Sequence, residues 1–206
     1  MNALLKVTKT DYSLISDLVK PGSSVLDLGC GDGELLRMLI DAKKVKGRGV
    51  DIDENNVIAC IEKGLSVCQS DIDAGLKDFQ DKSFDCVVLN QTIQVLQKPH
   101  VVIDEMLRVG RKAIVGFPNF SYLGLLTYLF LHGRMPKSKT LPFSWYDTPN
   151  IHLLTVQDFR DYCRDSGLVI EQEICLRGAK VRKAWPCLRW IENFFVEAAV
   201  FVISRD

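Results

Sequence analysis

The sequence has no apolar run long enough to cross a membrane. Its longest mostly apolar stretch covers residues 120–131, whereas a transmembrane helix needs about 20 residues. The first residues also lack the basic segment and apolar core of a signal peptide. We therefore expect a cytoplasmic protein that does not associate with membranes.

The sequence has no excess of charge and no ordered cysteine pattern. Because 26 Lys and Arg balance 26 Asp and Glu, no global positive field would attract nucleic acid. The densest basic segment, Lys180, Arg182 and Lys183, is either a local patch or a solvated loop. The seven cysteines are odd in number and include no CxxC pair, which excludes a disulfide framework. With no ligand-spaced histidines, no metal is expected either.

What is present is an alternation of short β-branched segments and longer amphipathic ones. Expected strands cover residues 24–28, 47–52, 67–70, 84–90 and 112–117, and expected helices cover residues 12–19, 33–42, 55–63 and 100–109. This order predicts βαβ units with a parallel sheet. The strands are apolar without alternation, as in sheets with helices on both faces. We expect a single α/β domain over residues 1–206.

Residues 118–150 interrupt this alternation with an apolar helix, 122–131, and a Gly- and Pro-rich stretch. Long irregular insertions of this kind are usually lids or partner surfaces. A helix over 155–167 follows, with Thr155 as N-cap and Gly167 as terminator. Two final strands are expected at 169–176 and 198–203.

The strongest local signal is a glycine loop that follows the first strand. Residues 25–33 read VLDLGCGDG, with glycines at 29, 31 and 33. Glycine allows positive φ and a close approach of backbone to a ligand. The GxGxG spacing differs from the GxGxxG of dinucleotide sites. Together with the preceding Asp27, it favours S-adenosylmethionine over NAD.

Three further polar segments follow the ends of the next strands. Asp51, with Ile52 beside it, is placed to bind ribose hydroxyls, whereas Asp53 reads as a helix N-cap. Asp71 either accepts a hydrogen bond from adenine, with Ile72 against the ring, or is a plain loop carboxylate.

The last of the three segments is Asn90-Gln91-Thr92. All of these residues should meet at the carboxyl edge of the sheet, where ligands bind in such folds.

These motifs resemble the class I S-adenosylmethionine-dependent methyltransferases. The matching text is VLDLGCGDG, GVDID, QSDI and SFDCVVLNQTIQ. The resemblance implies a Rossmann-like, mostly parallel seven-stranded sheet with an antiparallel last strand. It also implies a cofactor, S-adenosylmethionine or S-adenosylhomocysteine. The cofactor-binding residues it implies are Asp27, Gly29, Cys30, Gly31, Gly33, Asp51, Ile52, Asp71, Ile72 and Asn90.

A closer resemblance, to the methionine biosynthesis protein MetW family, runs nearly from end to end. It is carried by EMLRVGRKAIVGFPNF and above all by GRMPKSKTLPFSWYDTPNIHLLTVQDF. It is weakest in the last 35 residues. Two departures stand out, since the family pattern has Ser where this chain has Asn90 and Gly116.

The family resemblance implies a role beside a homoserine O-acyltransferase. That enzyme uses a GxSxG nucleophile elbow, which this chain lacks. The implied role is therefore that of a partner or regulator.

The sequence names no clear catalytic group. Of the three histidines, only His152 is a candidate base or substrate contact, whereas His100 and His132 read as helix-end residues. Gln91, Trp145 and Tyr146 are the other substrate-pocket candidates, with the alternative that the two aromatic residues anchor the insertion to the core.

Three functions stay open: an accessory protein, an autonomous methyltransferase on a small molecule, and a degenerate fold kept for interaction. Helix 122–131 is either a docking face or a lid.

Overall fold

The computed structural model of the 206-residue chain describes residues 12–138, 140–177, 180–183 and 189–205. Its strands are β1 (Ser24–Leu28), β2 (Lys46–Asp51), β3 (Val67–Gln69), β4 (Phe84–Asn90), β5 (Gly110–Pro118), β6 (Val169–Arg177), β7 (Lys180–Lys183) and β8 (Ala198–Ser204). Its labelled helices are α2 (Glu34–Lys43), α3 (Glu54–Glu62), α4 (Pro99–Val109), α5 (Leu123–His132), α6 (Val156–Asp165) and α7 (Arg189–Glu192). Residues 12–18 are also helical.

All strands form one sheet in the order β3-β2-β1-β4-β5-β8-β6-β7. The five strands from β3 to β5 are parallel, and β8 runs antiparallel to both β5 and β6. The expected α/β class with an antiparallel last strand is confirmed. The short β7 extends the edge beyond β6 as a hairpin.

The interpretation of Lys180, Arg182 and Lys183 as loop residues is wrong for the backbone. They lie on β7 because this segment pairs antiparallel with β6, in a register that places Lys183 opposite Ile174.

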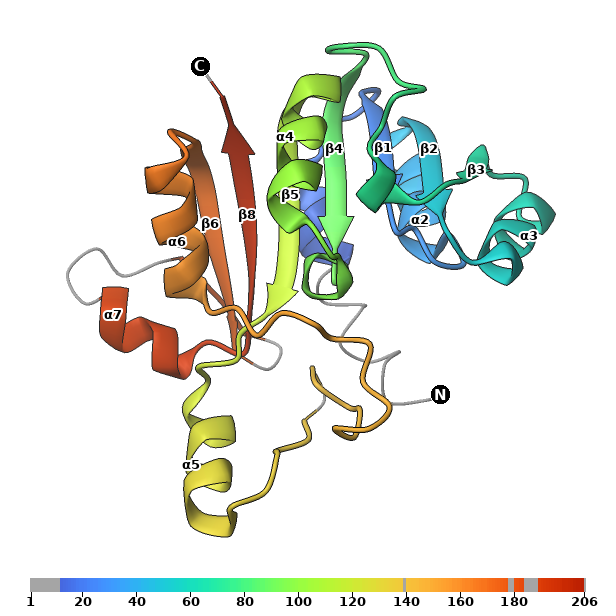
Figure 1. Ribbon diagram of the computed structural model, residues 1–206. Helices are drawn as coiled ribbons and strands as arrows, with labels where there is room; N and C mark the ends of the chain where they lie inside the picture. Colours follow the sequence, from blue (N-terminus) through green and yellow to red (C-terminus); the bar gives the residue numbers. More distant parts are fainter. Residues whose placement is uncertain (1–11, 139, 178–179, 184–188, 206) are drawn as a thin grey trace.

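Helices cover both faces of the sheet, as the unbroken apolar strands predict (Figure 1). On one face, α4 and α6 bury Met106 and Phe159 in the largest core cluster, against strand residues such as Phe117 and Phe201. On the other face, α2 and the helical residues 12–18 contribute Leu39 and Ile15 to a second cluster. The core therefore lies in two layers around a central sheet.

The predicted helix ends depend on local side-chain chemistry. Asp53 accepts a hydrogen bond from the Asn55 amide at 2.9 Å and caps α3. Thr155 and Asp158 form a capping box at the start of α6. Gly167 has a φ of 65° just after that helix. These three predictions are confirmed.

The segment between β5 and α6 lies beyond the carboxyl ends of the strands. Figure 1 shows α5 projecting away from the sheet below the end of β5, while residues 144–154 run beneath β4 and β5. Of its ten residues, α5 buries only Leu125. None of the helices in the described ranges has the length and hydropathy of a membrane span.

Candidate cofactor cleft and its surroundings

The glycine loop leaves β1 at the point where the strand order reverses between β1 and β4. All three glycines have positive φ, at 66° for Gly29, 55° for Gly31 and 78° for Gly33. A Cβ on Gly29 would lie 2.7 Å from Thr92 Oγ1, whereas one on Gly31 would meet nothing within 4 Å. Gly29 therefore allows close packing of the loop on the segment after β4, and Gly31 leaves an open edge.

The loop is held by the carboxylate of Asp51 at the end of β2. This buried carboxylate accepts hydrogen bonds from the Gly31 amide at 2.7 Å and from the Asp53 amide at 3.0 Å. The Asn56 side-chain amide donates to it at 3.2 Å. Asp51 thus ties the glycine loop to the start of α3, and any ligand contact would use its remaining lone pairs.

Asp27 lies beneath the loop, almost wholly buried, with 2% of its surface exposed. Its Oδ2 has no hydrogen-bond partner among the described residues. Burial, with a smaller contribution from the negative charge of Asp51, raises the pKa of Asp27 to about 7. A buried carboxyl oxygen without a partner is costly unless a donor completes it.

A cleft of about 480 Å³ opens at this edge of the sheet. Backbone and side chains from the ends of β1, β2, β3 and β4 meet around it, with one residue from the insertion. The lining residues are Gly29, Gly31, Asp51, Ile52, Asn56, Ser70, Asp71, Ile72, Asp73, Thr92, Val95, Leu96, Gln97 and Ile151. Six of the predicted cofactor residues are therefore brought together.

Two other predicted residues point away from the cleft. The Sγ atom of Cys30 lies 4.0 Å from that of Cys60 in a small apolar cluster. Burial raises the pKa of the Cys30 thiol, so it stays protonated. A Cβ on Gly33 would lie 2.4 Å from a methyl of Leu65. Both residues shape the loop by packing it against α3.

Asp71 and the unpredicted Asp73 organise the far wall. Asp71 accepts the Asp73 amide at 2.9 Å and caps the short helix η1 (Ile72–Ala74). Asp73 in turn accepts the Gln97 amide at 2.9 Å and the Lys98 amide at 2.9 Å. Asp73 follows the QSDI motif directly, so the motif itself was the signal that could have identified it.

Asn90 and Gly116 face each other across β4 and β5. A Cβ on Gly116 would lie only 2.3 Å from Asn90 Oδ1. That oxygen is buried without a partner in the described chain. The two departures from the family pattern are therefore one feature, since Asn90 needs the space that glycine leaves at position 116.

The next residue, Gln91, adopts a left-handed φ of 54°, which is uncommon for a non-glycine residue and is found at functional turns. Its amide donates to the Gly116 carbonyl at 2.8 Å. Gln91 itself does not line the cleft.

The block around Trp145 that carries the family resemblance reaches the cleft through its backbone. The amides of Ile151 and His152 both donate to the Gln94 carbonyl, at 2.8 Å and 3.0 Å. This contact places Ile151 in the cleft wall. Nothing in the sequence pattern singles out Ile151 among its neighbours.

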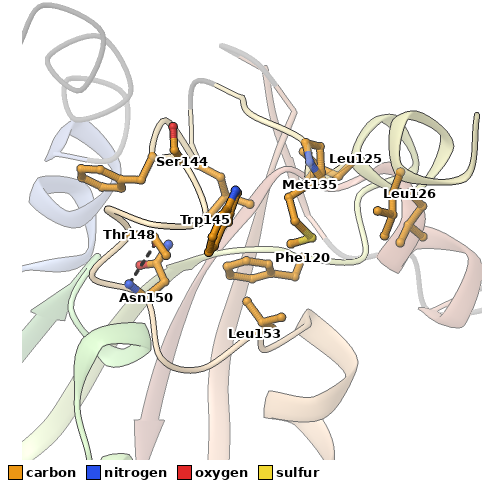
Figure 2. Close-up of a pocket in the computed structure, with 13 residues that line it drawn as sticks. Phe120, Leu125, Leu126, Met135, Ser144, Trp145, Thr148, Asn150 and Leu153 are labelled. Atoms are coloured by element: carbon orange, nitrogen blue, oxygen red, sulfur yellow. Dashed lines mark hydrogen bonds between the residues drawn. The ribbon is translucent and has the colours of Figure 1, made fainter. Parts of the chain in front are cut away.

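His152 and the two aromatic candidates lie elsewhere. His152 lines a separate pocket of about 310 Å³ between α4 and α6, with His100 and Tyr162. Trp145 lines a third pocket, of about 260 Å³, beside α5 (Figure 2). Trp145 and Tyr146 are 78% and 73% exposed, so they do not anchor the insertion to the core. The expected gathering of substrate candidates at the cofactor cleft is not seen.

Among the described residues, one group of potential cation ligands lies away from the cleft. Glu173, Cys175 and Glu192 offer ligand atoms within 4.8 Å of one another. The guanidinium of Arg160 pairs with both carboxylates. Because a cation already lies between the two carboxylates, this cluster is a buried ion-pair network, a feature that sequence spacing did not reveal.

Comparison with solved structures identifies the fold class. A SAM-dependent methyltransferase from Archaeoglobus fulgidus superposes with a TM-score of 0.66 at 19% identity, over 97% of this chain and 93% of that one. An S-adenosylmethionine-dependent methyltransferase from Mesorhizobium loti superposes with a TM-score of 0.69 at 14% identity, over 95% and 98%. These likenesses establish the class I methyltransferase fold and no more.

Comparison at the sequence level is more specific. The bifunctional methionine biosynthesis protein MetXA/MetW of Rhodopirellula baltica is 39% identical over 173 residues, which are 80% of this chain and 28% of that protein. The chain thus spans little more than a quarter of that relative. The family model described as methionine biosynthesis protein MetW matches residues 9–203. With nearly the whole length matched, the chain belongs to the MetW family.

Proposed function

We propose that this protein binds S-adenosylmethionine or S-adenosylhomocysteine in the cleft and acts with, or regulates, a homoserine O-acyltransferase of methionine biosynthesis. One observation carries the proposal: a 39% identical relative joins MetXA and MetW in a single chain. S-adenosylmethionine is made from methionine. A protein that binds it is therefore suited to report supply to an early step of the pathway.

The residues of the cleft fit the cofactor. The open edge at Gly31 admits a ligand against backbone. The free lone pairs of Asp51 suit ribose hydroxyls. Asp27 has an unpartnered Oδ2 beneath the glycine loop but is not among the residues that line the cleft. Asp71 and Ile72 would hold the adenine. When bound, the cofactor supplies an activated methyl group on a sulfonium.

Binding without methyl transfer is supported by the chemistry of the lining. The described wall of the cleft offers carboxylates but no His, Lys, Tyr or Cys side chain. His152, the weak catalytic candidate, lines another pocket. For an acceptor that must lose a proton, the only candidate bases at this wall are carboxylates that already accept backbone amides.

The second candidate is an autonomous methyltransferase on a small molecule. It is favoured by the fold shared with named methyltransferases and by the fact that positioning alone can lower a barrier by about 7–11 kcal/mol. Incubation with methyl-labelled S-adenosylmethionine and metabolite extracts tests it. A labelled small product that depends on the protein would favour this candidate over the first.

Calorimetric titration, with and without the purified acyltransferase, tests the first proposal. We expect saturable binding of S-adenosylmethionine. In Asp51→Ala the affinity should fall about tenfold or more, because the glycine loop loses the carboxylate that holds it. Asp53→Ala is the matched control, since it removes only the α3 cap. If the cofactor changes the affinity of this protein for the acyltransferase by some factor, the acyltransferase should change the affinity for the cofactor by the same factor, because coupling is reciprocal. Failure of the acyltransferase to bind or respond would contradict the proposal.

A further inference from the structure

Helix α5 is apolar on all sides yet hardly buried. Its sequence is LGLLTYLFLH, and Leu125 is its one buried residue. Phe130 is 88% exposed and Leu131 is 73% exposed. A helix that is hydrophobic all round is normally buried, and a ten-residue helix in water is marginal without packing. The composition of α5 is therefore that of a helix covered by something else.

The exposed face continues from α5 into the following loop. Eleven of the sixteen large apolar side chains that are exposed in the described chain lie between positions 123 and 153. Members of both segments line the pocket in Figure 2, where Leu125, Leu126 and Met135 stand on one side and Trp145 on the other, with Phe120 between them. Helix α5 and the following loop thus share this pocket, which is lined by the exposed Leu126, Leu129, Met135, Trp145 and Leu153.

This gathering of exposed apolar side chains is unusual for a surface without a partner. Each of the eleven is at least 36% exposed, whereas monomers rarely expose apolar patches above a few hundred Å². A stable complex buries about 800 Å² on each partner. The pocket at its centre, about 260 Å³, lies below the range of small-molecule sites, roughly 300–1,000 Å³. It is suited to one anchoring side chain from a partner.

We infer that α5 and residues 135–138 and 140–153 form the surface on which the acyltransferase docks, an inference that rests on the proposed function. In the Rhodopirellula baltica protein the region matching this chain is 28% of the length, so another unit of the same polypeptide shares its surroundings. Tethered units meet at an effective concentration in the millimolar range. An exposed apolar face of this kind needs such a permanent neighbour.

The same segment connects the docking surface to the cofactor cleft. Ile151 lines the cleft, while Asn150 and Leu153, on either side of it, line the pocket beside α5. The Ile151 amide is held to the Gln94 carbonyl at 2.8 Å. A ligand that displaces Ile151 therefore acts on the wall of the docking pocket, which gives cofactor and partner a shared element.

Substitutions on α5 test the inference with purified, full-length proteins. We expect Phe130→Ser and Leu131→Ser each to weaken binding of the acyltransferase by about tenfold or more, as measured by calorimetry. Ile61→Ser is the matched control: Ile61 is 60% exposed on α3, which packs beside β3 at the other end of the sheet. All three variants should keep the wild-type affinity for S-adenosylmethionine within about twofold, which shows that they are folded.

The outcomes separate this inference from the proposed function. If the wild-type protein binds the acyltransferase and the α5 variants bind equally well, the docking surface is wrong and the proposed function stands. If the wild-type protein does not bind it, the proposed function fails and this inference with it. Light scattering supplies a third result: a wild-type dimer that Phe130→Ser makes monomeric, with acyltransferase binding retained, would assign the surface to a second copy and overturn the inference.

Discussion

At the scale of single residues, the region of the cleft contains two buried aspartates that differ in their hydrogen bonding. Asp51 is satisfied by backbone and side-chain donors, whereas Asp27 is buried with one oxygen unpaired. The negative charge of Asp51 and the burial together favour the protonated form of Asp27. Because Asp27 does not line the cleft, this preference acts on the stability of the fold.

The raised pKa of Asp27 predicts a pH-dependent stability. In the unfolded chain the pKa is near 3.8, and in the folded chain it is about 7. The folded state therefore binds more protons between these values, and wild-type stability falls as pH rises through that window. Asp27→Asn stays neutral at every pH, so its stability lacks this decrease. From pH 4 to pH 7, its free energy of unfolding relative to that of the wild type should rise by a few kcal/mol, at about 1.4 kcal/mol per pKa unit. Urea titrations at both pH values measure it, and parallel pH profiles for the two proteins would refute it.

The Asn90 and Gly116 pair predicts a compensating double substitution. Gly116→Ser alone places a Cβ 2.3 Å from Asn90 Oδ1 and should cost about 1–3 kcal/mol through overpacking. Asn90→Ser together with Gly116→Ser recreates the family pattern and should recover most of that loss. A double-mutant cycle on thermal or urea unfolding gives the coupling energy. Additive effects of the two substitutions would show that the side chains do not compete for one space.

At the scale of elements, α6 is the most firmly specified helix. Its capping box starts it, and its apolar face buries Val156, Phe159 and Cys163. Arg160 lies on the same face and reaches Glu173 on β6 and Glu192 at the end of α7. This network links α6 to the last part of the sheet, and it needs all three charges because each is nearly buried.

Removal of the arginine should be far more costly than removal of an exposed one on the same helix. Arg160→Ala removes the guanidinium that pairs with the nearly buried carboxylates of Glu173 and Glu192 and should cost about 3–5 kcal/mol at neutral pH. Arg164 pairs with Asp161 and Asp165 at the surface, and Arg164→Ala should cost much less than Arg160→Ala because exposed ion pairs are screened by solvent. Chemical denaturation of both variants makes the comparison. Equal losses would mean that the buried network contributes no more than surface pairs.

At the scale of the whole molecule, two surfaces meet at the carboxyl edge of the sheet. The cofactor cleft is built from strand ends, and the apolar surface is built from α5 and the loop after it. Residues 144–154 run between them. The fold thus places a small-molecule site and a candidate partner surface at the two sides of this one segment. The helices that cover the two faces of the sheet do not take part in it.

The sequence by itself determined the elements and the position of the cleft. Apolar runs without alternation, caps at Asp53 and Thr155, and glycines after β1 are local signals, and each acts within a few residues of the chain. Because the strands are parallel, their carboxyl ends then lie at one edge of the sheet, where ligands bind in such folds. The family motifs added the antiparallel last strand.

Only the tertiary structure decided which side chains meet there. The close approach of the Asn90 side chain to Gly116 depends on the register of β4 against β5. The packing of Leu65 on Gly33 depends on how α3 and the residues after it lie against the glycine loop. His152 lines the pocket between α4 and α6, whereas its neighbour Ile151 lines the cleft, and both of their amides donate to the Gln94 carbonyl. The exposure of α5 is equally nonlocal, since an apolar helix is buried or exposed according to what the rest of the chain, or a partner, places against it.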